Sequence, residues 1–224
     1  MNIERILATR GNRTTRGGKP FHVFHNSFSQ CLSAGQSLLD SPNQPHAALL
    51  ERAAVITTVT AIEVYYKDVL DGIFRICDST FFEPHLKRIH QTKYDITDLI
   101  TFHRKSIHPL ELIASSVSFQ NAEAIDSVFS NFLGKSLWSS VLGLQVRIAD
   151  KPETECKFDH THLEDLKQIF ALRHELVHDP AHVPVFNQQC YDQIASAGFL
   201  VFGSDIILMK MITENQDPSV AANA

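Results

Sequence analysis

Glycine and proline are scarce in this chain: nine of each occur among 224 residues, about 8% against roughly 12% in an average protein. Long stretches without these two residues favour long helices over a turn-rich β-sandwich or barrel. An excess of basic charge is missing too, because 20 Lys and Arg stand against 25 Asp and Glu, for a formal net charge of −5. This balance excludes a strongly basic nucleic-acid-binding coat but leaves room for a local basic cleft.

Cysteines are few and widely separated. They stand at Cys31, Cys77, Cys156 and Cys190. No CxxC pair occurs among them, so neither a zinc ribbon nor a thioredoxin-type redox site is supported. We interpret them as reduced, mostly buried thiols of a cytoplasmic protein. A membrane span is not expected either, because the longest apolar stretch, 197–212, is interrupted by Ser204 and Asp205 and is typical of a buried helix.

Apolar residues recur with helical spacing from residue 21 onward. A first helix is expected from Phe21 to the turn at 41–43. The longest helix is predicted next, over about 46–77. Its β-branched cluster at 55–60 would suit a strand by propensity, but the length of the segment and its lack of turn residues favour a helix.

The middle of the chain, 80–150, predicts a series of shorter helices. Their expected ranges are 95–102, 109–117, 122–133 and 137–148. Residues 150–153 have the composition of a linker, and we find no good β-strand run in the sequence.

The last third predicts two further helices. The first is capped by Asp159, or by Thr161 with Glu164 completing a capping box, and it ends before Asp179. The second runs from about 187 to 214 and is nearly all apolar in its second half.

These patterns together predict an all-α protein with a single domain over residues 21–214. Residues 1–20 hold five basic residues and one acidic residue, and they are expected to form a flexible basic arm. Residues 215–224 are small and polar and are expected to form a flexible tail.

The segment 172–180 contains the residues best suited to chemistry. Arg173 and His178 could together cleave RNA without a metal, because an arginine offers a fork of donors to a phosphate and a histidine accepts a proton near neutral pH. That reaction needs a 2′-hydroxyl to lose its proton and the phosphate charge to be stabilised. Five helical residues rotate a side chain by about 500°, so the two residues point about 140° apart on a straight helix. They converge only on a fraying last turn or across two subunits.

In these residues the chain resembles the HEPN superfamily of prokaryotic nucleotide-binding and ribonuclease domains, in particular its RiboL-PSP/MAE-type branch. Arg173-His174-Glu175-Leu176-Val177-His178 matches the RxxxxH motif near a helix end. The segment 60–70, with Ala61-Ile62-Glu63, is similar to an early family helix in which an acidic residue faces the motif arginine. The resemblance covers the helix order over about 21–212.

The resemblance implies a helical bundle that dimerises, here with additional helices inserted in the middle of the chain. It further implies a metal-independent endoribonuclease without a cofactor, cytoplasmic, acting as a toxin or antiviral-defence effector that leaves 2′,3′-cyclic phosphate ends. Its partners would be RNA, a second copy and an antitoxin or defence-system protein. Arg173 would polarise the scissile phosphate, His178 would act as general base or acid, His174 would contact the phosphate, and Glu63 would hold Arg173.

Two other interpretations share the same residues. His174-Glu175-x-x-His178 is the zincin signature, in which two histidines at i and i+4 share a zinc ion and the glutamate activates water. A third ligand is hard to find, because the longer metzincin pattern would need other residues at Ala181 and Pro184. Alternatively the protein is a catalytically inactive HEPN module that binds nucleic acid or a partner. Arg173 then has only a structural role, in an ion pair with Glu63.

Overall fold

The computed structural model describes residues 4, 7, 19–42, 45–148, 151–179 and 186–221. Within these ranges the protein is all-α apart from one two-stranded sheet, which confirms the predicted class. The helices are α2 (Pro20–Asp40), α3 (Ala47–Ile76), α4 (Ser79–Ile89), α5 (Ile96–Arg104), α6 (Pro109–Ser116), α7 (Ala122–Leu133), α8 (Leu137–Leu142), α9 (His160–His178), α10 (Gln188–Glu214) and α11 (Pro218–Ala221).

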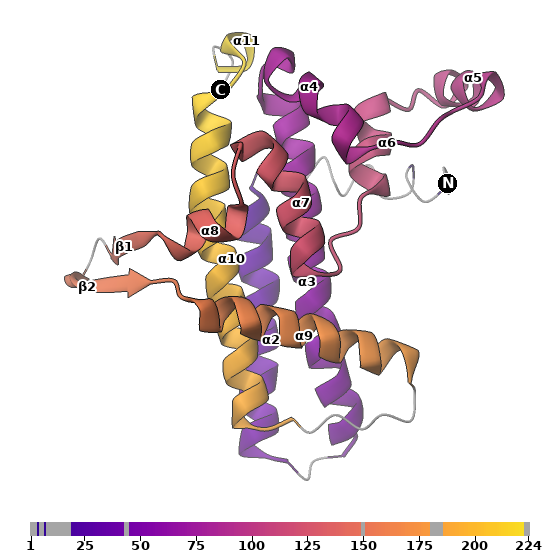
Figure 1. Cartoon of the computed structure of the whole chain (residues 1–224). Helices are drawn as coiled ribbons and strands as arrows, with labels where there is room; N and C mark the ends of the chain where they lie inside the picture. Colours follow the sequence, from indigo (N-terminus) through magenta and orange to yellow (C-terminus); the bar gives the residue numbers. More distant parts are fainter. Residues whose placement is uncertain are drawn as a thin grey trace.

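Three long helices run side by side and α9 crosses them (Figure 1). The long elements are α2, α3 and α10, and α9 packs mainly on α10 and α3. Because α9 lies across the bundle, its last turn extends to one side and reaches the surface near the beginning of α3 (Figure 1). The fold thereby presents the end of α9, where the sequence places the candidate chemistry, at an open edge.

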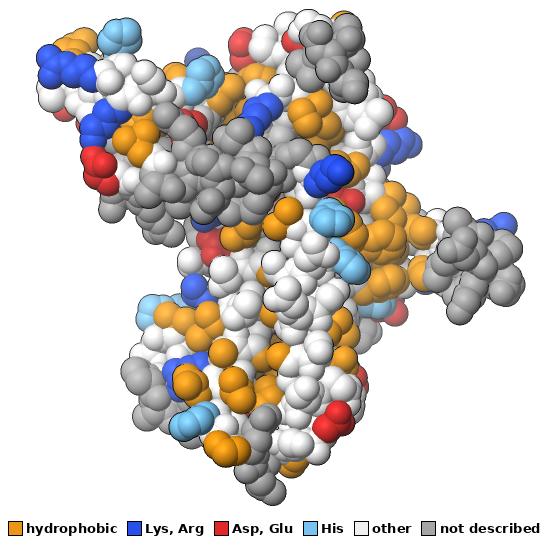
Figure 2. Space-filling view, turned by 180° about the vertical axis from the view of Figure 1, so that it is seen from behind, with side chains coloured by type: hydrophobic (Ala, Val, Ile, Leu, Met, Phe, Trp, Pro, Cys, Tyr) orange, Lys and Arg blue, Asp and Glu red, His pale blue; other side chains and the backbone are white. Residues whose placement is uncertain are grey.

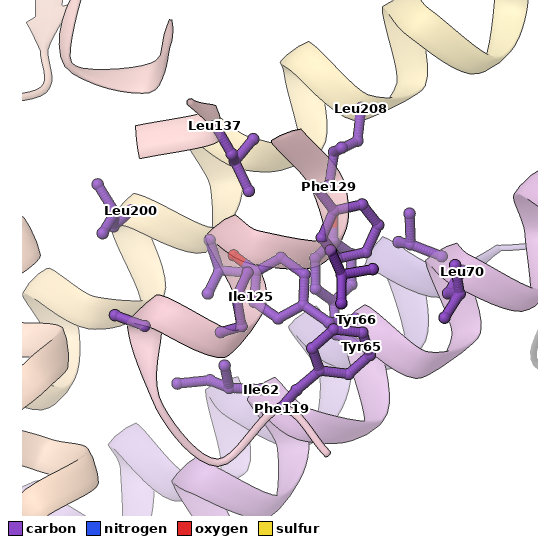
Figure 3. Close-up of a cluster of buried hydrophobic side chains, with 14 of the residues drawn as sticks. Ile62, Tyr65, Tyr66, Leu70, Phe119, Ile125, Phe129, Leu137, Leu200 and Leu208 are labelled. Atoms are coloured by element: carbon purple, nitrogen blue, oxygen red, sulfur yellow. The ribbon is translucent and has the colours of Figure 1, made fainter. Parts of the chain in front are cut away.

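A single large core lies where α3, α7, α8 and α10 meet (Figure 3). Tyr66 is completely buried there, in contact with the rings of Phe119, Phe129 and Trp138. Such large apolar side chains each contribute roughly 1.5–3 kcal/mol on burial. This packing explains why the β-branched segment 55–60 is helical: Val55 and Val59 are buried on the inner face of α3.

Polar groups inside the bundle are bonded across α3 and α10. The Tyr66 hydroxyl lies 2.8 Å from Ser204 Oγ, and Tyr65 donates a 2.9 Å hydrogen bond to Asp205. Bonded pairs of this kind fix the register of the two helices, because a slip of either would leave buried polar groups unsatisfied.

The middle of the chain departs from the expected helices in two places. A helix not expected from the sequence, α4, begins at Asp78, whose side chain accepts the Thr80 N–H at 2.8 Å, and contains Pro84. The helix expected over 137–148 ends at Leu142, and Gly143 follows as its C-cap.

An antiparallel hairpin replaces the second half of that expected helix and the expected linker. Its strands are β1 (Gln145–Ile148) and β2 (Lys151–Lys157), paired from Gln145 with Lys157 onward. Polar and apolar residues alternate along 145–148, which is the two-residue period of a strand. The expectation of no strand was therefore wrong at this point.

Residues 215–217, which were expected to belong to a flexible tail, are held by hydrogen bonds. Asp78 N–H donates to Asn215 O and Asp217 N–H to Ile76 O, so residues 215–217 are fastened to the end of α3. In the expected basic arm, Glu4 forms an ion pair with Lys105 and Leu7 packs on the small cluster around Phe102. The arginines of the arm lie outside the described residues.

The cysteines and the apolar helix agree with their predicted burial. Cys31, Cys77 and Cys190 are buried, Cys156 is half-buried, and all four are free thiols. Helix α10 is long and apolar enough to cross a membrane, but half of its most apolar window is buried inside the protein. Figure 2 shows the reverse side, where hydrophobic side chains form a patch beside the projecting hairpin.

Candidate functional site

Helix α9 begins with a strong cap. Asp159 accepts N–H bonds from Thr161 and His162, and the His162 ring accepts the Asp159 N–H at 3.2 Å in return. Of the two caps that the sequence allows, the structure thus uses Asp159, with His162 instead of Glu164 completing the box. The helix then runs without interruption to His178, and Asp179 is its C-cap.

The last turns of α9 are held against the beginning of α3 by an arginine. Arg52 Nη1 donates a 2.6 Å hydrogen bond to the carbonyl oxygen of Leu176, which is itself buried. The last four carbonyls of a helix lack partners within the helix, and a cation there also meets the negative end of the helix dipole. Arg52 therefore fixes the position of the turn that carries His174 and His178.

Arg173 is half-buried, and no hydrogen bond or ion pair of its side chain occurs among the described residues. Its Nε atom is enclosed and has no hydrogen-bond acceptor. The expected ion pair with Glu63 is not formed: Glu63 is instead bonded to Lys67 on its own helix at 3.0 Å. An enclosed donor without an acceptor costs about 1–3 kcal/mol, so Arg173 stays in place despite that cost.

The two histidines of the motif lie together on the exposed side of α9. The ring centroids of His174 and His178 are 4.4 Å apart, with the ring planes inclined by 50°. Arg173 is half-buried whereas both rings are exposed, because the helix stays regular to His178 and its residues keep their ideal rotation. The structure thus places the ring of His174 next to that of His178. It does not bring Arg173 and His178 into contact within the described chain.

Apolar residues are exposed around the same edge. Leu49, one turn before Arg52, is 63% exposed, and Leu50 and Val177 are each 43% exposed. Hydrophobic, histidine and cationic side chains are interspersed at the lower end of the face in Figure 2. Exposed large apolar side chains beside polar ones are typical of contact surfaces.

The carboxylate of Glu51, near the beginning of α3, also lies at this edge. Glu51 is partly desolvated, and this burial raises the pKa of its carboxyl above the ordinary value, against the lowering effect of a hydrogen bond from the Phe186 backbone. The beginning of α3, the end of α9 and the residues before α10 therefore meet here, with segment 180–185 outside the described residues.

The arrangement offers only part of a metal site. His174 and His178 are close enough to share an ion, but no group of three or more His, Cys, Asp or Glu that could hold a metal occurs in the described part of the chain. His182, which follows the histidine pair in sequence, lies outside that part.

Arg52 is the residue of this site that the sequence did not single out. It appears there only as one position of the long predicted helix, and nothing local marks its bond to a carbonyl 124 residues away. The first turns of α3 come close to the last turns of α9 only through tertiary packing, which local sequence patterns do not indicate.

Comparisons with family models, with curated proteins and with solved structures found no match for this chain.

Proposed function

We propose that the protein is a metal-independent endoribonuclease of HEPN type, cytoplasmic, that cleaves RNA to 2′,3′-cyclic phosphate ends as a toxin or antiviral-defence effector. The observation that carries the proposal is Arg173, whose enclosed Nε has no acceptor, on the same helix end as His174 and His178. A guanidinium left without a protein carboxylate is available to a phosphate, which it can bind through two parallel N–H bonds.

The proposed reaction uses Arg173, His178 and His174 in the roles that the sequence suggests. His178 removes the proton of the 2′-hydroxyl, the 2′ oxygen attacks phosphorus, and the bond from phosphorus to the 5′ oxygen breaks as that oxygen takes the proton back from His178. Arg173 stabilises the charge that builds on the phosphate oxygens in the transition state. His174, whose ring lies against His178, would orient that ring or donate to a phosphate oxygen. Arg52, not Glu63, would hold the catalytic turn in place.

The divergence of Arg173 and His178 on one helix favours a site shared by two copies of the chain. The exposed Leu49 and Leu50 on the first turn of α3 and Val177 on the last turn of α9 supply apolar area for such a contact. A two-fold arrangement would set Arg173 of one copy against His178 of the other. An antitoxin or defence-system protein would act by covering the same edge.

Single substitutions test the chemistry. Arg173→Ala and His178→Ala should each abolish cleavage of RNA in EDTA, with folding and oligomeric state unchanged. The matched control is His160→Ala, which removes an exposed histidine at the opposite end of α9 and should leave cleavage unaffected. Full activity in either of the first two variants would refute the assignment.

Mixing the two inactive variants tests the shared site. If Arg173 and His178 act from different copies, co-refolded Arg173→Ala and His178→Ala chains should recover about a quarter of wild-type activity, since half of the dimers are mixed and each holds one intact site. No recovery from a mixed dimer would place both residues in the same chain.

A zinc peptidase is the second candidate, favoured by one observation, the 4.4 Å separation of the His174 and His178 rings. Under this alternative Glu175 activates the bound water. Purified protein would then contain about one zinc per chain, and Glu175→Gln would abolish proteolysis. Protein free of zinc that cleaves RNA in EDTA excludes it.

A further inference from the structure

A polar hollow of about 510 Å³ lies between α4, α7 and the turn that joins α7 to α8, apart from the α9 site. The hollow is open to solvent, so a ligand bound in it would stay partly exposed. Its lining is His85, Arg88, Asp126, Ser130, Asn131 and the turn Gly134-Lys135-Ser136. The elements that form it pack on one another, α4 on α7 and α7 on α8 (Figure 1).

The two cations of the hollow take part in no ion pair within the described residues. They are Arg88 and Lys135, and both are exposed. The one carboxylate in the lining is already engaged, because Asp126 Oδ1 accepts bonds from Ser136 Oγ at 3.1 Å and from the Leu137 and Trp138 N–H groups at 2.6 and 3.3 Å. The lining of the hollow therefore carries a net positive charge.

His85 adds a donor to this lining. Its Nδ1 atom is enclosed and has no hydrogen-bond partner, and its ring lies against those of Phe81 and Phe132. A proton on Nδ1 would be a buried donor without an acceptor, so the proton is placed on Nε2, at the other edge of the ring. With its proton on Nε2, His85 has an N–H group rather than a lone pair to offer to a ligand of the hollow that it lines.

The turn after α7 is made by the glycine that ends the helix. Gly134 has φ 67° and ψ 6°, in the left-handed region, directly after the right-handed residues of α7. Glycine adopts this backbone without steric cost, whereas most residues do not.

The side chain of Asn131 would favour a phosphate ester that carries a hydroxyl group over a phosphate ion alone. Its amide nitrogen donates to Ser127 O at 2.5 Å and to Val128 O at 3.4 Å. The amide oxygen is consequently the atom left for a ligand, and an oxygen there favours a hydroxyl group rather than a second phosphate oxygen.

We infer that this hollow binds the terminal phosphate of a hydroxylated small molecule, a sugar phosphate, with Arg88, Lys135 and His85 on the phosphate and Asn131 on a hydroxyl. The inference is independent of the proposed ribonuclease activity, since none of these residues belongs to α9 or to the beginning of α3.

Calorimetric titration of the full chain tests the inference, with ribose 5-phosphate, inorganic phosphate and ribose as probes. Wild type should bind ribose 5-phosphate, bind inorganic phosphate more weakly, and not bind ribose. The double variant Arg88→Gln/Lys135→Gln should weaken binding of both phosphates by about a hundredfold or more, because each charge-assisted bond accounts for at least about tenfold.

Two further variants complete the test. Lys87→Gln removes a neighbouring exposed cation of α4 that does not line the hollow, and it should bind as wild type does. Asn131→Ala should lower the affinity for ribose 5-phosphate while leaving that for inorganic phosphate unchanged. Absence of saturable phosphate binding, equal binding of ribose, or equal losses in Lys87→Gln and in the double variant would overturn the inference.

Discussion

Replacing Arg173 by leucine should stabilise the protein, although it removes a charged group from the half-buried side of the last turns of α9. Leucine matches arginine in helix propensity and retains an apolar stem. The substitution removes the enclosed Nε donor, whose lack of an acceptor costs about 1–3 kcal/mol. Some packing of the longer stem is lost, so we expect a net gain of about 1 kcal/mol in the free energy of unfolding, or about 2–4 °C in Tm, together with the loss of RNA cleavage.

Urea denaturation measures this change, and Arg75→Leu is the matched control. Arg75, in the last turn of α3, forms an ion pair with Asp71, which is buried. Its removal leaves a buried carboxylate unpaired and should lower the free energy of unfolding by about 1–3 kcal/mol, less than for a fully buried pair because Arg75 itself is partly exposed. A loss of 3 kcal/mol in Arg173→Leu would show that Arg173 is a structural ion-pair residue and would refute the reasoning.

Three other predictions concern the fold. Gly72→Ala should raise the free energy of unfolding by about 0.5–1 kcal/mol, because the new Cβ meets no atom within 4 Å. Gly198→Ala should lower it by about 1–3 kcal/mol, because its Cβ would lie 2.1 Å from the Phe28 ring. The midpoints of urea denaturation test both predictions. Burial raises the pKa of Asp205, so its contribution to stability is fully present below the ordinary pKa of 3.8 and is lost as the pH rises through the folded value. Asp205→Asn should therefore exceed wild type in Tm at pH 7, with a difference that vanishes below pH 3.8. Cys156 should react first with iodoacetamide at pH 8, because burial raises the pKa of the other three thiols, to about 11 for Cys77 and Cys190. Peptide mass spectrometry after timed quenching measures the order, and an earlier reaction of a buried thiol would contradict the prediction.

The long helices could be predicted because a single physical pattern dominates each. Helix α3 spans Ala47–Ile76 against an expected 46–77, and α10 spans Gln188–Glu214 against an expected 187–214. Both are long and have apolar residues at helical spacing. The helix α7 matched its expected range of 122–133, and its Asn121 cap and the glycine after it are local signals.

The hairpin and α4 could not be predicted because competing local signals were weak there. Residues 145–148 continue the apolar spacing of α8, and only their pairing with β2 makes the strand favourable. Helix α4 contains Pro84, which is a helix breaker at most interior positions.

At the candidate site the sequence indicated which residues share a helix end but not which of them touch. The contact of His174 with His178 follows from their spacing of four residues. The partner of Glu63 does not follow from spacing to Arg173, since Lys67, one turn away on the same helix, is nearer. The role of Arg52 depends on how α9 crosses the bundle, which no local pattern encodes.

The most direct test of the central claim is incubation of purified protein with total cellular RNA in EDTA, beside the Arg173→Ala/His178→Ala double variant. We predict that wild type alone cleaves the RNA, that EDTA does not prevent cleavage, and that the products end in 2′,3′-cyclic phosphates. Cleavage by the double variant equal to that of wild type, or cleavage that EDTA abolishes, would contradict a metal-independent ribonuclease built on Arg173 and His178.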